Sequence, residues 1–563
     1  MFKKEEEINV EQALLDENCT EKCDAESEVV ACEAPVKGPK KFINSIDNYF
    51  GITKSGSNFR TEIIAGITTF MAMAYILIVN PDILGVAFGA EMKGALYVAT
   101  CLGAIVGTLM MSLHAKHPFA LASGMGLNAY FAFTIVLGSN GLITPANGLF
   151  IILISGVVFL LLTLVGVREK IVDAIPKAVK DAIPAGIGLF IAFIGLQNAK
   201  IIKGNSATLV ALMDLNFLKV PFTFLFPAIV TFIAFMLIAI LSKLNVKGAI
   251  LWGILGGTAL YYVMGYAGGF YGFGANNEEK VVSYLISIGS LKEDFVLTPD
   301  TTGDVIGAIA AINPGALAPD FANMDLNPIN AFSKWGTDLV GIVFTDGWKF
   351  SGDAATITGI FISAVLAFAM VDMFDTVGTL LGTAKKADML DKDGKLPRMS
   401  KALLSDSIAT CTGAIFGTTT VTTFVESSAG VAEGGRTGFT SLVVAILFFI
   451  AMFITPLAYL IPSCATAAAL IYVGVLMIST IKDIDFADVA VAVPAFLTVS
   501  MMVFTYNISF GIGLGLISHC VIMLCTGRYF KTVDGEKLKY LKQDALTIVL
   551  AILFTLNFIL VSH

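Results

Sequence analysis

Residues 99–108 read ATCLGAIVGT and residues 409–418 read ATCTGAIFGT, so the two blocks agree at eight of ten positions. Each block lies in the second apolar stretch of a set of seven such stretches. Each is followed by a short stretch that small or polar residues interrupt. Because seven is an odd number, two consecutive sets of seven crossings enter the bilayer from opposite sides. The repeat therefore predicts two inverted halves, which is a common plan of secondary transporters.

The apolar residues of this 563-residue chain are gathered into blocks rather than spread evenly. Hydrophobic residues make up 56% of the sequence and charged residues only 14%, whereas soluble domains carry roughly 25% charged residues. Blocks such as GLFIILISGVVFLLLTLVGV at 148–167 are long enough for a helix to cross the hydrocarbon core of a bilayer. They are continuous rather than alternating, which favours helices over barrel strands. We therefore predict an all-α polytopic membrane protein.

The blocks predict fourteen transmembrane segments as two inverted repeats of seven. The segments are expected near residues 61–80, 95–113, 118–137, 146–167, 183–199, 221–241, 246–265, 357–378, 401–418, 419–431, 438–460, 465–481, 489–506 and 509–526. The predicted organisation is a disordered cytoplasmic tail (1–45), a first repeat (46–265), an extracytoplasmic loop (266–353), a second repeat (354–530) and a C-terminal segment (531–563) with an additional apolar helix at 544–561.

The short loops between the segments carry an uneven distribution of Lys and Arg. Basic residues gather in the stretches 168–180, 243–247, 385–401 and 528–542, which fall on one side of the predicted bilayer. Basic loops stay in the cytoplasm. The pattern therefore predicts a multi-pass protein of the plasma (inner) membrane with a cytoplasmic N-terminus.

Several function classes fit this sequence poorly. A net charge of −8 without a basic stripe argues against nucleic-acid binding. The eight cysteines lack zinc-site spacing. We find no Walker A pattern and no nucleophile–base motif at membrane depth. We therefore expect no enzyme activity, no catalytic or metal site and no cofactor.

Two interrupted apolar stretches occupy matching places in the two halves. The first is PFALASGMGLNAYFAF at 118–133, where Gly124 and Gly126 precede Asn128, and the second is TTTVTTFVESSAGVAEGGRTG at 418–438. A broken span exposes backbone groups at membrane depth, which is tolerated only where protein or a water-filled cavity receives them. Close helix packing through small residues would explain either stretch alone. The matched pair favours a transport site.

Two carboxylates, Asp372 and Asp375, lie in the apolar stretch AMVDMFDTVGTLLG. Their spacing of three residues places both on one helix face. A charged carboxylate at the bilayer centre costs about 2.5–3.5 kcal/mol, and burial beside a like charge favours the neutral form. At least one of the pair is therefore expected to exchange a proton near neutral pH, as a proton-coupled carrier requires. The alternative is a structural role, such as capping a broken span or pairing with Lys385.

A third carboxylate, Glu426, lies within the second interrupted stretch, close to Phe424 and Ser427. A carboxylate can accept hydrogen bonds from N–H donors of a heterocycle, and an aromatic ring can stack on its face. These residues are therefore candidates for binding a planar, hydrogen-bonding solute.

Five motifs in this order carry a resemblance to a known family. They are FMAMAYILIVNPDIL, GMGLNAYFAF, DMFDTVGTLLG, LDKDGKLPRMSKALLSDS and TTFVESSAGVAEGGRTG. Together they resemble the AzgA-like branch of nucleobase–cation symporter family 2, which comprises adenine and guanine/hypoxanthine permeases. The resemblance covers about residues 45–561, apart from most of 266–350. The acidic tail and the long stretch 266–353 depart from the family pattern.

The resemblance implies a fold and a function. It implies fourteen helices arranged as core and gate domains, with a short strand and a half-helix in spans three and ten. It also implies a purine nucleobase (adenine, guanine or hypoxanthine):proton symporter that works by alternating access, with H⁺ as the coupling ion, and often as a homodimer. Carried over by motif, the substrate-binding residues would be Asn128, Asp372, Glu426, Phe424 and Ser427, and the proton-coupling residues would be Asp372, Asp375 and Glu426.

Other functions on the same fold stay open at this point. They are a transporter of another nucleobase or of an inorganic anion and, with less support, a channel. Facing carboxylates would repel an anion, and a binding site built from them suits uptake and release better than conduction.

Overall fold

The computed structural model describes residues 39–166, 175–205, 208–216, 218–272, 277–292, 295–298, 301–319, 327–386, 389–391, 396–530, 532–533, 536–537 and 544–560. The chain divides into two units, Met1–Tyr49 and Phe50–His563. In the first, residues 1–38 of the predicted tail lie outside the described residues, and helix α1 (Pro39–Phe50) begins at Pro39.

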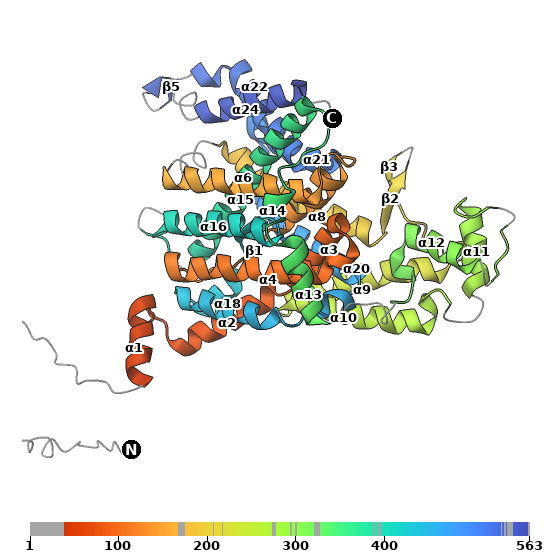
Figure 1. Ribbon diagram of the computed structural model, residues 1–563. Helices are drawn as coiled ribbons and strands as arrows, with labels where there is room; N and C mark the ends of the chain where they lie inside the picture. Colours follow the sequence, from red (N-terminus) through yellow and green to blue (C-terminus); the bar gives the residue numbers. More distant parts are fainter. Residues whose placement is uncertain are drawn as a thin grey trace, which may run out of the picture. The chain divides into compact units, whose positions relative to one another are not determined.

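Nine helical stretches within the described part of the chain are long and apolar enough to cross a membrane. They comprise α2 with α3 (Phe59–Met73 and Ile76–Phe88), α4 (Lys93–Met110), α6 (Pro145–Leu164), α8 (Lys177–Asn198), α9 (Phe222–Lys243), α10 (Ala249–Met264), α15 (Ala354–Lys386), α20 (Ser463–Met477) and α22 (Ile508–Cys525). Figure 1 shows the helices of the bundle lying nearly side by side. The prediction of a polytopic, mainly helical membrane protein is confirmed.

Shorter elements complete the predicted segments. They are α5 (Met125–Ala129), α16 (Met399–Phe416), α17 (Ser427–Ala432), α18 (Gly438–Ala451), α21 (Val489–Phe504) and α24 (Ala545–Leu560). Each of the fourteen stretches expected from the sequence thus contains a helix, or a short strand followed by a helix. The number of crossings stays a prediction, because several of these elements are too short to span a bilayer as single helices.

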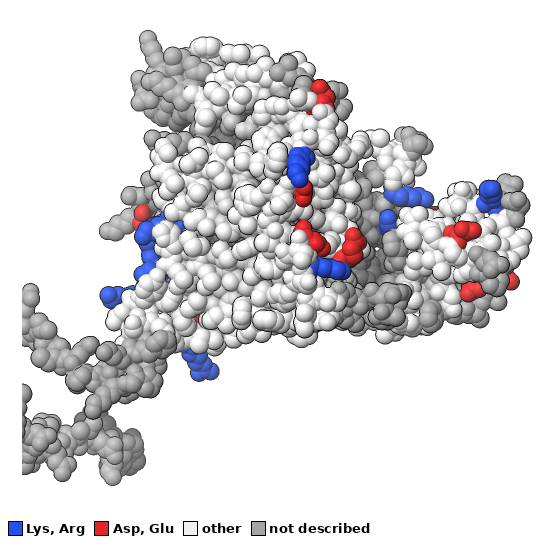
Figure 2. Space-filling model, in the orientation of Figure 1, with Lys and Arg blue, Asp and Glu red and all other residues white. Residues whose placement is uncertain are grey.

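The surface of the bundle is largely apolar. On the face drawn in Figure 2, the described Lys, Arg, Asp and Glu side chains are sparse over the helices. Large apolar side chains point outward instead, among them Leu161, Phe232, Phe449 and Phe504, which are 57%, 57%, 52% and 76% exposed. Outward-facing apolar side chains on long helices are what a lipid environment requires.

The stretch predicted as a loop at 266–353 contains helices α11 (Asn277–Ser287), α12 (Thr302–Ile312), α13 (Pro328–Lys334) and α14 (Ile342–Thr345). An apolar cluster joins α11 and α12 to the start of α9, with Phe224 and Leu225 against Leu285 and Ile309. Helix α11 was not predicted from the sequence, because its first turn is polar and only one of its faces is apolar. A hairpin of β2 (Ile202–Asn205) and β3 (Leu209–Leu212), also not predicted, follows α8.

Two three-residue strands join the halves of the chain. Strand β1 (Leu121–Ser123) pairs antiparallel with β4 (Val421–Thr423), and Ala122 lies opposite Thr422. Figure 1 shows β1 among the helices of the bundle, near α4 and α16. The strand and short helix that the resemblance implies for spans three and ten are therefore present in both places.

Threonines on the flanking helices bond to the backbone of the strand pair. Thr108 of α4 donates to the Leu121 carbonyl and accepts from the Leu121 N–H, both at 3.0 Å. Thr410 of α16 donates to the Val421 carbonyl at 3.4 Å. Because no water is available in hydrocarbon, such partners are needed wherever a helix is broken there.

The repeated glycines of the two blocks allow the helices to approach the strands. A Cβ on Gly413 would lie 2.8 Å from the Thr419 carbonyl oxygen, and one on the equivalent Gly103 would lie 3.0 Å from a methyl group of Thr418. Real Cβ contacts are longer than 3.0 Å, so a larger residue would push the helix away from the strand. Two positions of the sequence repeat thus serve the strand pairing.

A buried carboxylate fixes the start of α18. Glu62, in the first turn of α2, is fully buried. It accepts hydrogen bonds from the N–H groups of Arg436, Thr437 and Thr440 and from both threonine hydroxyls. These donors lie at the N-terminus of α18, where a negative charge is favourable. Glu62 therefore has a structural role.

We predict that Glu62→Gln lowers the thermal stability of the purified protein. The amide can accept through one oxygen only, so buried donors lose their partner, and hydrogen bonds to charged groups contribute about 1.5–3 kcal/mol each. The apparent melting temperature in detergent should fall by about 2–5 °C. Glu279→Gln, at an exposed position of α11, is the control. Equal melting temperatures for the two variants would contradict this role.

Candidate functional site

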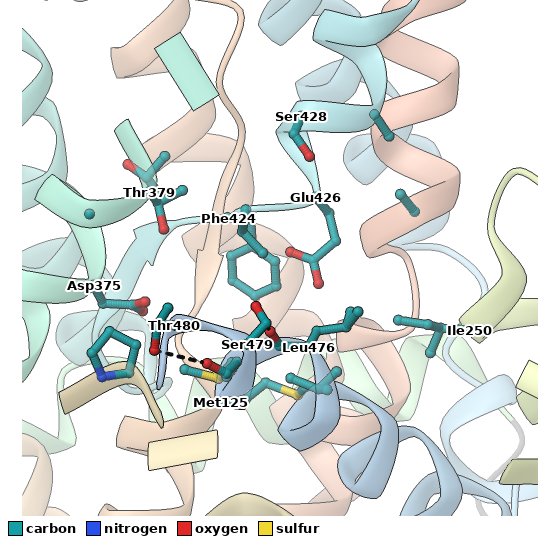
Figure 3. A pocket seen from close by; sticks show the side chains of 18 of the residues that line it. Met125, Ile250, Asp375, Thr379, Phe424, Glu426, Ser428, Leu476, Ser479 and Thr480 are labelled. Carbon is teal, nitrogen blue, oxygen red and sulfur yellow. Dashed lines mark hydrogen bonds between the residues drawn. The ribbon is translucent and has the colours of Figure 1, made fainter. Parts of the chain in front are cut away.

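A cavity of about 1090 Å³ lies where the elements that follow the two strands meet α15 and α20. Its wall includes Tyr75 at the break between α2 and α3, Met125 at the start of α5, and Asp375 of α15. Phe424 and Glu426, between β4 and α17, complete the polar and aromatic part. Figure 3 shows the Phe424 ring with Asp375 on one side and Glu426 on the other.

Glu426 is held by a tyrosine. It is half-buried and occupies the position before α17, but its side chain makes no capping hydrogen bond to that helix. The Tyr75 hydroxyl donates to Glu426 Oε1 at 2.6 Å. Tyr75 lies where α2 changes into α3, and there the Leu77 and Ile78 N–H groups bond to carbonyls only three residues back. The sequence analysis did not single out Tyr75, although it lies in one of the five motifs.

Asp375 faces the same cavity from α15. It accepts a hydrogen bond from the Thr422 hydroxyl of β4 at 3.3 Å. Thr379, one turn further along α15, also lines the cavity. Asp375 and Glu426 form no ion pair with a Lys or Arg within the described residues. The structural alternative of pairing with Lys385 is not visible, because that side chain lies outside the described part.

Asp372 lies deeper than Asp375, away from the cavity wall. It is fully buried. The Thr410 hydroxyl lies 3.3 Å from Asp372 Oδ2 and 3.4 Å from the Val421 carbonyl oxygen, so these two acceptors share its one hydrogen. A fully buried carboxylate that the sequence analysis missed, Asp406 of α16, accepts from the Thr376 hydroxyl at 2.7 Å. The rule that drew attention to Asp372 would have found Asp406 too, because it falls within the predicted span 401–418.

Two predicted substrate residues serve the junction of the halves. The Ser427 hydroxyl accepts from the Ala120 N–H at 3.0 Å and is fully buried. Asn128 is also fully buried, and its side-chain carbonyl accepts from the Thr419 hydroxyl. Neither lines the cavity, whereas Ser428 does. Their direct contact with a substrate stays a prediction. In this conformation both side chains are buried beneath the residues that line the cavity.

The Asn128 side chain also has an unused donor. Its Nδ2 is buried and has no hydrogen-bond partner within the described part of the chain. The four residues before Asn128 line the cavity.

Charged residues surround the other end of the cavity. Lys180 and Asp181 of α8 contribute to its wall, as does Asp483 after α20. Lys247, between α9 and α10, forms an ion pair with Glu433 at 2.9 Å. This end lies at the C-terminal end of α20, and its Lys180 and Lys247 belong to the basic stretches 168–180 and 243–247.

His117 is a titratable group just outside the spans. Burial, and secondarily the charge of Arg398, lower the pKa of His117 to about 4. Its Nε2 lies 2.9 Å from the Pro397 carbonyl. The ring is therefore neutral at physiological pH.

The sequence matches the model of the permease family over residues 60–289 and 331–514. The chain belongs to the permease family. The resemblance identified from the five motifs is thereby confirmed, and the chain is a permease rather than an enzyme. Helix α12 lies in the interval that the family model does not match.

Relatives of this permease cover most of its length. A permease of Methanocaldococcus jannaschii is 40% identical over 517 residues, which are 92% of this chain and 99% of that protein. The adenine permease AdeP of Escherichia coli is 37% identical over 86% of this chain and 91% of its own length. The guanine/hypoxanthine permease PbuO of Bacillus subtilis is 36% identical, with 85% and 95% covered.

We predict that neighbouring serines of this permease differ in reactivity. In a background without the eight native cysteines, Ser428→Cys should react with a water-soluble maleimide roughly tenfold faster than Ser427→Cys, since thiol reactivity follows exposure. Mass spectrometry of the purified variants measures both rates. Equal rates, or faster labelling at position 427, would show that the cavity wall is placed wrongly.

Proposed function

We propose that this permease is a secondary active transporter that carries a purine nucleobase together with protons by alternating access. The observation that supports this most directly is the placement of an aromatic ring between two carboxylates in one cavity. The relatives described as adenine and guanine/hypoxanthine permeases support the substrate class.

The chemistry of the cavity wall suits a purine. Phe424 offers an apolar face on which a planar base can stack. Asp375 and Glu426 offer acceptors on either side of that ring, and a purine base carries N–H donors on both of its rings. Charge-assisted hydrogen bonds of this type are shorter and stronger than neutral ones. The cavity is larger than a single base requires, so it also includes an access path.

The same carboxylates disfavour an inorganic anion. Neither Asp375 nor Glu426 is neutralised by an ion pair within the described residues, so an anion placed beside Phe424 would meet two acidic groups. A neutral base with N–H donors meets acceptors instead. This comparison supports the nucleobase over the anion as the solute.

Proton coupling rests on the carboxylates of this region. We assign proton exchange to Asp375 and Glu426, which reach the cavity, and to Asp372 as a deeper group. Ionisable residues inside a membrane are costly and usually mark a substrate or ion path. Hydroxyl groups of Thr410 and Thr422 lie beside Asp372 and Asp375. Each hydroxyl can donate a hydrogen bond to the charged carboxylate or accept one from the protonated acid, so either protonation state has a partner.

We infer that the conformation is open to the cytoplasm. Charged residues line the cavity at the C-terminal end of α20, among them Lys180 and Asp483, and this is where we infer that it opens. At the N-terminal end of the same helix, Thr466 donates to Asp82 at 2.7 Å, and Asp82 pairs with Lys93 at 2.5 Å. These contacts join α3 and α4 to α20 and close the other side. The basic loops support an orientation with a cytoplasmic N-terminus, and we propose that the chain lies in the inner membrane.

The complete architecture is part of the same proposal. We propose fourteen crossings in two inverted repeats, with core and gate domains that move against each other. The pairing of β1 with β4, each followed by a short helix, supports the inverted relation of the halves. A homodimer is proposed from the family resemblance, and chemical cross-linking in membranes would test it.

Uptake into proteoliposomes tests the proposed function. With an inward proton gradient, the wild-type protein should accumulate radiolabelled adenine, guanine or hypoxanthine in a saturable way, and collapse of the gradient should abolish accumulation. Glu426→Gln should lower kcat/KM at least about tenfold, because the ligand loses a hydrogen bond to a charged acceptor.

Two controls make this result specific. Glu279→Gln, which removes an exposed carboxylate of α11, should transport like the wild-type protein. Radiolabelled sulfate should not accumulate. If folded, reconstituted wild-type protein moves no nucleobase, the proposed substrate is wrong. If accumulation does not depend on the proton gradient, the proposed coupling is wrong.

A further inference from the structure

Tyr75 contacts the carboxylate of Glu426, which we propose binds the substrate. It is 1% exposed, and its hydroxyl donates to Glu426 Oε1 at 2.6 Å. The two residues are separated by 351 positions in the chain and come from different halves. A buried phenol needs a hydrogen-bond partner, and here the partner is a cavity-lining carboxylate.

The hydrogen bond from Tyr75 restricts the orientation of the Glu426 carboxylate. The short helix that follows does not engage the carboxylate, because the Ser427 and Ser428 N–H groups already bond to the carbonyls of Phe424 and Val425. Within the described residues, no second side chain donates a hydrogen bond to Glu426; its own backbone N–H is the other donor. Three rotatable bonds would otherwise let the carboxylate sample several orientations, and ordering it on binding would cost entropy.

We propose that Tyr75 is a positioning residue for substrate binding. It engages Oε1 of Glu426 and thereby leaves Oε2 as the oxygen that accepts an N–H of the substrate. Glu426 then makes one fixed hydrogen bond to the base rather than a pair of exchangeable ones. This role rests on the proposed function, since it acts through Glu426 on a bound nucleobase.

The helix that follows Tyr75 is held firmly in place. The residue lies at the start of α3, and five residues later on the same helix Asn80 donates to Thr100 and Thr418. Helix α3 is therefore anchored to both repeat blocks, and the phenol is held at a fixed position relative to β4. A rigid support of this kind is what a binding group needs to stay pre-organised.

A purely structural role for Tyr75 makes a different prediction. If the hydroxyl only stabilised the break between α2 and α3, its removal would reduce the amount or stability of folded protein. It would do so whether or not Glu426 kept its charge. A double-mutant cycle separates the two roles, because residues that act through one contact show non-additive effects.

The experiment compares wild type, Tyr75→Phe, Glu426→Gln and the double variant in proteoliposome uptake of the purine that the wild type transports best. Tyr130→Phe is the matched control, because Tyr130 is equally buried and its hydroxyl bonds to Ser509 at 2.6 Å, away from the cavity. Melting temperatures and gel-filtration profiles establish that each variant is folded.

The expected result is a rise in KM for Tyr75→Phe of about tenfold, with kcat changed much less, since a pre-organised charge-assisted contact is weakened. In the Glu426→Gln background, the same substitution should change KM by less than about twofold. Tyr130→Phe should keep the wild-type KM.

Two results would overturn the inference while leaving the proposed function intact. One is an unchanged KM in Tyr75→Phe with wild-type uptake of the base. The other is an equal loss in both backgrounds, which would make Tyr75 a stabilising residue only. If the wild-type protein carries no nucleobase, the proposed function fails first and the role of Tyr75 fails with it.

Discussion

Backbone hydrogen bonding between β1 and β4 is the constraint on which the site depends. A three-residue strand at membrane depth leaves N–H and C=O groups that lipid cannot satisfy. Here each strand satisfies the other, and Thr108 and Thr410 bond to the backbone from the flanking helices. Neither half of the chain can therefore form its broken span alone. The pairing brings the two halves together, and the elements that follow the strands meet at one cavity.

The residues that follow each strand have two different roles. After β4, Phe424 and Glu426 face the cavity, while Ser427 turns back and accepts the Ala120 N–H. After β1, residues 124–127 line the cavity, while Asn128 accepts from Thr419. Cavity-lining residues and residues that join the two halves are thus immediate neighbours in both stretches. A substitution at Ser427 or Asn128 would affect the cavity indirectly, because it would shift the backbone that carries Phe424 and Glu426.

The sequence predicted the frame of this arrangement better than its details. The repeat at 99–108 and 409–418 located both interrupted spans, and the cost of buried charge drew attention to Asp375 and Glu426. Helical spacing placed Asp372 and Asp375 on one face but could not tell which of them reaches the cavity, because that depends on the depth at which α15 crosses β4. Tyr75 carried no signal, since an aromatic residue in an apolar span is ordinary and its partner lies in the other half. Helix α11 was hidden by its polar first turn.

We propose that a purine base binds against Phe424, between Asp375 and Glu426. A cryo-electron microscopy map of the full chain in lipid nanodiscs, with and without a saturating purine, tests it most directly. We expect planar density for the base on the Phe424 ring, within hydrogen-bond distance of both carboxylates, and only in the sample that contains the base. Density for the base elsewhere, or identical maps under conditions where saturable binding is measured, would contradict it.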